Sequence, residues 1–452
     1  MRKITDWPWS LILLTLCLAY AVYKQGGVEL EDWSVSLLGL GILALATGLG
    51  PRNREFAPSL ERWLWCPSLI LLGYTAFQLV PLPIGLLKRL SPARAGLNEA
   101  LTTLVGVGAA APVSVIPSAT WGHLLNVAGY TLTFLLVREM CWQRADRKWT
   151  LTLPLLTVAG LEAALGLAQS GLGEGADVAQ GNYINRNHFA GLLEMVLPFA
   201  VMYALVVFRR GMAHRRFSAL TAVKTCVLLA LATLIFLGIV FSLSRMGFIA
   251  SLCSLFVAGA LAVGAGLSTR KRWLAVAAVA ALIALSFVFL PPDALILRFA
   301  SLASEDLSGD LRLQVWKDSL HLVAAYPLLG CGLGGYESAF LKFNTGAPML
   351  TMDYAHNDYL QLLAELGILG FLIVAILMLA ILLKAVSAAL QHPKANDRYL
   401  GLACTGAMTA IFIHSVVDFN LYIPANALLL AWIAGIAVSL PGNSGEWRVA
   451  RD

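Results

Sequence analysis

The sequence predicts an all-α integral membrane protein with about 12 transmembrane helices and a large outer loop. Three observations lead to this fold class. Hydrophobic residues make up 59% of the 452 residues and charged residues only 13%, with a mean hydropathy of +0.76, whereas soluble chains carry roughly 25% charged residues. The apolar residues come in blocks of about 17 to 25, long enough to cross a bilayer as helices. Basic residues gather between alternate blocks.

The apolar blocks predict twelve spans. They lie at 8–23, 33–50, 63–81, 121–137, 149–169, 188–208, 222–243, 246–268, 273–290, 358–383, 399–418 and 423–440. Both termini then share one side, and if that side is the cytoplasm its segments hold 22 of the 32 Lys and Arg residues. The basic excess is therefore an orientation signal and does not predict a nucleic-acid partner. We expect the first span to be a retained anchor, because no small-residue cleavage site flanks it.

The chain divides into N-terminal helices (1–180), a region with most of the polar motifs (181–440) and a cytoplasmic tail (441–452). Two outer loops, 82–120 and 291–357, are longer than connectors need to be, and we expect function in the second.

An amphipathic helix is predicted inside the second loop, ending at Tyr326-Pro327. The residues that recur at i, i+3 and i+4 spacing are Arg312, Val315, Trp316, Ser319, Leu320, Val323 and Ala324. The following stretch, 330–335, is rich in glycine but follows no predicted strand, so we interpret it as a flexible turn and not as a dinucleotide loop.

Three arginines are candidates for binding an anion. Arg245 follows a tight turn between two spans, where it either snorkels to lipid headgroups or offers its planar fork to a diphosphate. Arg186 precedes a span, and we expect Asn187 to cap the start of that helix. The free backbone N–H groups there could bind an anion together with Arg186. The alternative is a capped helix start with an exposed Arg. Arg312 begins the loop helix.

His356 is the sharpest single candidate for catalysis. It stands in a polar stretch that turns into a span, where the positive helix end disfavours the charged imidazole. A neutral imidazole can act as a general base on a hydroxyl; the alternative is an interfacial histidine that only hydrogen-bonds its loop. Glu365 lies deeper in the same span and is either functional or held by a buried partner.

Other polar residues in the spans leave alternatives open. His414 and Asp418, four residues apart, are expected on one helix face, where they either orient an arginine or form a packed pair. Glu162 and Glu194 are each an arginine's counter-ion, a proton-relay member or a packing contact. The histidines and cysteines show no metal-binding spacing and no disulfide pattern, so we expect no metal and no cofactor.

Several short stretches, in this order and spacing, resemble the O-antigen ligase and polymerase superfamily over about 181–420. They are Asn185 to Glu194, Ser242 to Gly247, Arg312 to Trp316, Tyr326 to Gly335 and His356 to Gly367. The resemblance implies a GT-C-type glycosyltransferase bundle that is inverting and metal-independent and works at the periplasmic face of a bacterial inner membrane. It implies transfer of a glycan from undecaprenyl diphosphate to a hydroxyl of a lipid-linked glycan or of lipid A-core, with membrane lipid around the enzyme.

The resemblance also implies roles for residues. Arg245 and Arg312 would grip the donor diphosphate, with Arg186 as a further contact, and His356 would activate or position the acceptor. Preorganised arginines can stabilise a departing phosphate without a metal. The remaining candidate substrate-binding residues are Asn187, His188, Asn357, Tyr359, His414 and Asp418.

The sequence leaves alternative functions open, and each predicts different observations. Within the family we favour a polymerase over a ligase, because the Asn185-to-Ala190 stretch and the Pro-rich 80–120 region look like those of exopolysaccharide-associated relatives. A transporter of the same lipid-linked sugar predicts ionisable groups near the bilayer midplane, whereas here they gather at the outer surface. A non-catalytic scaffold would tolerate loss of Arg245, Arg312 and His356.

Overall fold

Helices occupy eleven of the twelve ranges that the sequence predicts. The structure, a computed structural model, describes residues 9–48, 62–106, 109–172, 178–213, 218–264, 309–346 and 350–440. The helices in the predicted ranges are α1 (Trp9–Tyr23), α2 (Leu30–Gly48), α3 (Arg62–Phe77), α6 (Pro117–Gln143), α7 (Leu153–Leu172), α8 (Arg186–Ala213), α9 (Ala219–Phe241), α10 (Arg245–Gly264), α15 (Asp358–Gln391), α16 (Ala395–His414) and α17 (Pro424–Val438). The remaining predicted span, 273–290, lies outside the described residues.

Seven stretches of the described chain are long and apolar enough to cross a membrane, judged by length and composition. They are Leu30–Thr47, Pro117–Gln143, Lys148–Gly171, Arg186–Met212, Ala219–Phe241, Arg245–Val263 and Asp358–Gln391. Shorter apolar helices cover Trp9–Tyr23, Leu64–Phe77 and Pro424–Val438. The described part of the chain is therefore an all-α, multi-pass membrane protein, with one small antiparallel pair between β1 (Leu82–Pro83) and β2 (Ala110–Ala111).

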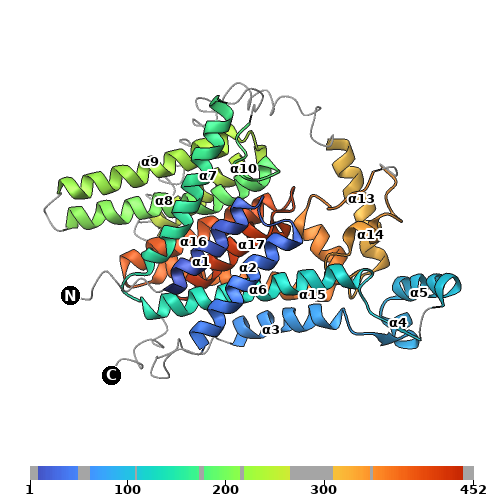
Figure 1. The fold of residues 1–452 in the computed structure, drawn as a ribbon. Coiled ribbons are helices and arrows are strands. Elements are labelled where there is room, and N and C mark those ends of the chain that lie inside the picture. Colours follow the sequence, from blue (N-terminus) through green and yellow to red (C-terminus); the bar gives the residue numbers. More distant parts are fainter. Residues whose placement is uncertain are drawn as a thin grey trace.

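Helices α16 and α17 form the centre of the bundle (Figure 1). Helix α16 packs against α8, α10 and α15, and α17 packs against α6 and α15. Three successive leucines of α17, Leu428 to Leu430, are all buried. A helix that is apolar on every side belongs in the core of a large bundle.

Small residues let α16 approach its neighbours closely. A Cβ added to Gly401 would come within 2.6 Å of the Ala389 backbone nitrogen on α15. One added to Gly406 would lie 3.0 Å from Ser254 on α10 and 3.1 Å from Pro198 on α8. Close backbone approach at small residues is the usual way in which membrane helices gain packing energy, since lipid removes the hydrophobic drive between them.

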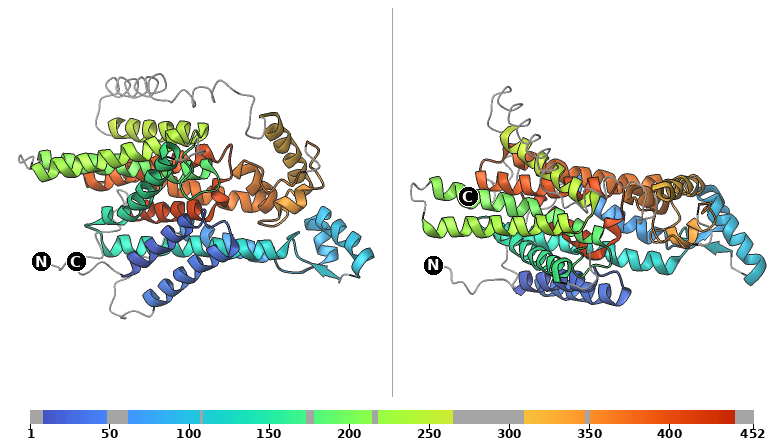
Figure 2. Two further views of the ribbon diagram at one scale, coloured as in Figure 1. Left: turned by 45° about the horizontal axis from the view of Figure 1, so that its top comes forward. Right: turned by 90° about the horizontal axis from the view of Figure 1, so that it is seen from above.

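The two long outer loops meet at one end of the bundle. The first contributes α4 (Ile84–Leu90) and α5 (Pro92–Val105), and the second contributes α13 (Gly309–Ala325) and α14 (Tyr336–Phe340). All four helices gather at the same end in each view (Figures 1 and 2). This end is the one that the sequence predicts to face outward.

The predicted amphipathic loop helix is confirmed as α13, with two differences. Val315, Ser319 and Leu322 are buried, at i, i+4 and i+7 along the helix. Leu320 and Ala324, both in the predicted pattern, are exposed. The predicted pattern joins two neighbouring stripes of the helix, and only one of them packs against α14 and α15.

Candidate functional site

Helices α8 and α15 begin beside one short segment, residues 415–422. The backbone N–H of Asp358, at the start of α15, donates to the carbonyls of Ser415 (2.9 Å) and Asp418 (3.0 Å). On α8, Gly191 packs against the Asn420 side chain. Helix α10 begins beside α8, because a Cβ on Gly247 would come 2.6 Å from the Cβ of Ala190. The positive ends of α8 and α15 therefore lie at this segment and that of α10 lies next to α8, an arrangement that favours an anion.

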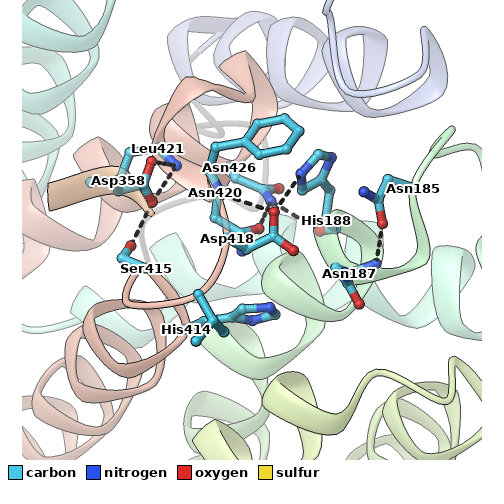
Figure 3. Close-up of polar contacts among 12 residues, drawn as sticks. Asn185, Asn187, His188, Asp358, His414, Ser415, Asp418, Asn420, Leu421 and Asn426 are labelled. Carbon is cyan, nitrogen blue, oxygen red and sulfur yellow. Dashed lines mark hydrogen bonds and ion pairs between the residues drawn. The ribbon is translucent and has the colours of Figure 1, made fainter. Parts of the chain in front are cut away.

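A buried histidine–carboxylate contact links α8 to this segment. The His188 Nε2 atom lies 3.4 Å from the Asp418 carboxylate, and both residues are at most 5% exposed (Figure 3). Burial raises the pKa of Asp418, but the His188 hydrogen bond and the charges of His188, His414 and His356 outweigh it, so the pKa is lowered overall. Asp418 is therefore a buried carboxylate that stays ionised.

His356 stands beside the same segment, directly before α15. Its backbone has φ +50°, a left-handed conformation that costs about 1–2 kcal/mol outside glycine. Its ring meets that of Phe419 edge-on at 5.0 Å between centroids, and the Tyr354 ring stacks on Phe419 at 4.0 Å. The Asn357 side chain caps α15 by accepting from the Leu360 N–H at 3.0 Å. The strained backbone thus holds a half-buried imidazole at a helix start.

Helix α13 covers this arrangement and brings Arg312 to it. The Arg312 Nη1 atom donates to the Val417 carbonyl at 3.4 Å. One turn further on, the Trp316 indole donates to the Ala355 carbonyl at 3.0 Å. Arg186 and Arg245 are the first residues of α8 and α10, which touch in their first turns, and both are half-buried.

The structure thus brings His188, His356, Arg312 and Asp418 to one segment, with two further arginines at neighbouring helix starts. Tyr359 donates to the Phe412 carbonyl at 2.7 Å and so ties α15 to α16. The substrate-binding roles of all these residues stay predictions.

Two geometric predictions are wrong. Asn187 does not cap α8: the Asn185 side chain accepts from the Asn187 N–H at 2.8 Å instead (Figure 3). His414 and Asp418 do not share a helix face, because α16 ends at His414. The chain turns there because Ser415 bonds Asp358 through both its carbonyl and its hydroxyl (2.7 Å), which carries Asp418 towards α8.

The buried carboxylates within the helices have polar partners of their own. Glu194 lies 3.0 Å from His414 Nδ1, and both are fully buried. Glu162 accepts from the backbone N–H and the side chain of Asn182, at 2.9 and 2.6 Å. Asp358 accepts from Ser415 and from the Leu421 N–H. Sequence reasoning missed Asp358, although an acidic residue in the first turn of a long apolar helix was the available signal.

The glycine-rich stretch 330–335 is not a flexible turn, contrary to the prediction. Gly330, Gly332 and Gly334 all have positive φ, and a Cβ on Gly330 would collide with the Glu365 carbonyl. The Gly334 N–H donates to the Glu365 carboxylate at 2.9 Å and the Tyr336 N–H at 3.2 Å. Glu365 is thus held by buried donors, which fixes this outer loop on α15.

The same carboxylate fixes the end of the 415–422 segment. The Tyr422 hydroxyl donates to Glu365 at 2.7 Å. Burial and the neighbouring Glu365 raise the pKa of Tyr422 well above its usual value, so the phenol keeps the proton that makes this bond. Glu365 therefore connects the glycine-rich loop with the segment that carries Asp418.

These features define a class: a multi-pass helical membrane protein with a cationic polar centre at one end of its bundle. Residues 229–375 match the family model described as O-antigen ligase, so this part of the chain is similar to that family. The matched range includes Arg245, Arg312 and His356, whereas His188 and Asp418 lie outside it. A comparison with curated proteins finds no match for the chain.

Proposed function

We propose that the protein is a membrane glycosyltransferase that moves a glycan from undecaprenyl diphosphate to an acceptor hydroxyl at the periplasmic face of a bacterial inner membrane. The observation that carries the proposal is that Arg312, His356 and the starts of α8 and α15 lie beside residues 415–422, with Arg186 and Arg245 as the first residues of the neighbouring helices α8 and α10. Such a centre suits a diphosphate. The O-antigen ligase family match over 229–375 supports glycan transfer of the ligase or polymerase type.

The proposed reaction is a single displacement. The acceptor oxygen bonds to the anomeric carbon while the bond from that carbon to the donor phosphate oxygen breaks, and the configuration inverts. Arg245 and Arg312 stabilise the negative charge left on the diphosphate, with Arg186 as a further contact, so that no metal is needed for this task.

His356 takes the proton of the acceptor hydroxyl in this proposal. The imidazolium that forms lies in the field of the buried Asp418 carboxylate, whose pKa the charge of His356 helps to lower. Asp418 is therefore proposed to stabilise the protonated base without touching the substrate, with His188 holding Asp418 in place.

Within this function we favour a polymerase, which adds a glycan to another lipid-linked repeat. A ligase, which adds it to lipid A-core, is the alternative, and both need the same charges. The test is a transfer assay with purified protein and lipid-linked repeats alone. Elongated products support the polymerase, a strict requirement for lipid A-core supports the ligase, and no transfer to either acceptor contradicts the proposal.

A further inference from the structure

A buried arginine lies where the two outer loops meet. Arg94, in the first turn of α5, is 6% exposed, and its Nε atom donates to the carbonyl of the fully buried Ser114 at 3.1 Å. The next residue, Val115, donates its N–H to the Cys331 carbonyl at 2.8 Å and so joins this loop to the glycine-rich loop. In each view, α5 lies on the opposite side of α13 from α8 and α10 (Figures 1 and 2). Arg94 therefore belongs to the contact between the loops and not to the candidate site.

The Arg94 guanidinium is buried without a counter-ion. Its Nη1 atom has no hydrogen-bond partner, and no carboxylate pairs with it in the part of the chain that the structure describes. Burial lowers the pKa of Arg94, and the nearby Tyr326 opposes this shift only in part. Because arginine has donors only and stays protonated, its burial costs free energy unless an anion accompanies it.

A second buried polar group without a partner lies in the same helix turn. Ser91 is the N-cap residue of α5, but its side chain makes no capping hydrogen bond, and its buried Oγ atom has no partner. Arg94 is the third helical residue, and an N-cap side chain meets the third helical residue across the first turn. The first turn of this 14-residue helix contains no acidic residue to complement its positive end. Hydroxyl, guanidinium and helix start therefore meet at one place.

We propose that Ser91, Arg94 and the start of α5 bind a small inorganic anion, for which chloride is the simplest candidate. Ser91 is 2% exposed, so the ligand must be small, and chloride is little larger than a water molecule. A water molecule in the same place would leave the charge of Arg94 uncompensated. Lys88 and Arg89, exposed in the last turn of α4 directly before Ser91, make the approach to the site positive. The bound ion would hold α5 on the contact between the outer loops, whatever reaction the protein performs.

The first test compares chloride with gluconate, which is too large for the site, at equal ionic strength. Hydrogen exchange of the α5 amides is measured on the full chain in nanodiscs. We expect exchange in the wild type to be about threefold or more slower in chloride, since a ligand that binds the closed state protects it. Arg94→Met should lose this response, and Arg89→Met, which removes an exposed arginine five residues earlier, should keep it. No response of the wild type, or the same response in Arg94→Met, would overturn the proposal.

The second test supplies the negative charge covalently and so does not depend on a variant that loses a contact. Ser91→Asp places a carboxylate at the N-cap beside Arg94, and Ser91→Asn has the same shape without the charge. We expect the α5 amides of Ser91→Asp to exchange slowly in gluconate already, with no further slowing in chloride, and those of Ser91→Asn to exchange faster than those of Ser91→Asp in gluconate. Equal exchange in the two variants, or a chloride response of Ser91→Asp equal to that of the wild type, would contradict an anion at this site.

Discussion

The two ends of α16 each carry a buried polar cluster, and the two clusters differ in kind. At the end that the sequence predicts to face inward, here the inner cluster, Asp397 lies 3.1 Å from Lys148 and 3.4 Å from His392, and Trp149 donates to the Asn396 carbonyl at 3.2 Å. At the end predicted to face outward, here the outer cluster, Asp418 faces His188, and Glu194 faces His414.

The comparison separates a structural ion pair from the proposed reactive centre. In the inner cluster, a lysine beside an aspartate neutralises charge and fixes the 148–152 turn to the α15–α16 connection. These contacts stabilise the fold. Both clusters contain histidine, whose proton can move near neutral pH, but Arg312 and the starts of α8 and α15 lie beside the outer cluster. Buried charge alone therefore does not identify the candidate site in this protein. The residues and helix starts around the charge do.

The largest expected effect is on catalysis at the outer cluster. We expect His356→Ala to lower the glycan-transfer rate by about 10²–10⁴, the usual range for loss of a general base. His321→Ala serves as the matched control, because His321 is an exposed histidine on α13 and should leave the rate unchanged. Initial rates with a defined lipid donor check both. Equal rates for wild type and His356→Ala would remove His356 from the reaction.

At the inner cluster we expect a large effect on stability and none on transfer. Lys148→Met leaves the Asp397 carboxylate buried without its lysine, which should cost about 3–5 kcal/mol of unfolding free energy. Lys394→Met removes an exposed lysine 3.9 Å from Asp146 and should cost almost nothing. Thermal unfolding in detergent measures the difference. A changed KM for the donor in folded Lys148→Met protein would erase the contrast between the clusters.

A smaller effect should distinguish charge from geometry at Arg312. Arg312→Lys keeps the charge but loses the planar fork, so we expect transfer to fall about tenfold, while Arg312→Ala should lose about 10²-fold. Arg209→Lys is the control at the other end of the molecule, where Arg209 bonds the Tyr399 hydroxyl. If lysine restored full activity at position 312, the bidentate role would be wrong.

The smallest effect concerns the outer loop and its dependence on pH. Asp318 is buried, which raises its pKa, but hydrogen bonds from Thr345, Gln314 and Gly346 outweigh this and lower the pKa overall. A lowered folded pKa gives stability that is present above the unfolded pKa of about 4 and is lost as pH falls through the folded value. We expect Asp318→Asn to weaken the loop by about 1–2 kcal/mol at pH 7. Limited proteolysis should show this difference at neutral pH and its decrease in acid; a constant difference would contradict it.

Local sequence patterns predicted the helices well, because apolar blocks and the i, i+4 stripe of α13 are properties of neighbouring residues. The pairings Glu194 with His414 and His188 with Asp418 join residues more than two hundred positions apart, and no local pattern contains them. The end of α16 at His414 and the rigidity of 330–335 also depend on distant partners, Asp358 and Glu365. Arg312 and His356 were found from motifs, whereas their meeting at 415–422 required the fold.

The most direct measurement is the affinity of the purified protein, in nanodiscs, for polyprenyl diphosphate without sugar. We predict that wild type binds it, that Arg245→Ala and Arg312→Ala each weaken binding about tenfold or more, and that Arg209→Ala does not. Binding that stays unchanged in both outer variants would contradict the claim that these helix starts form a diphosphate site.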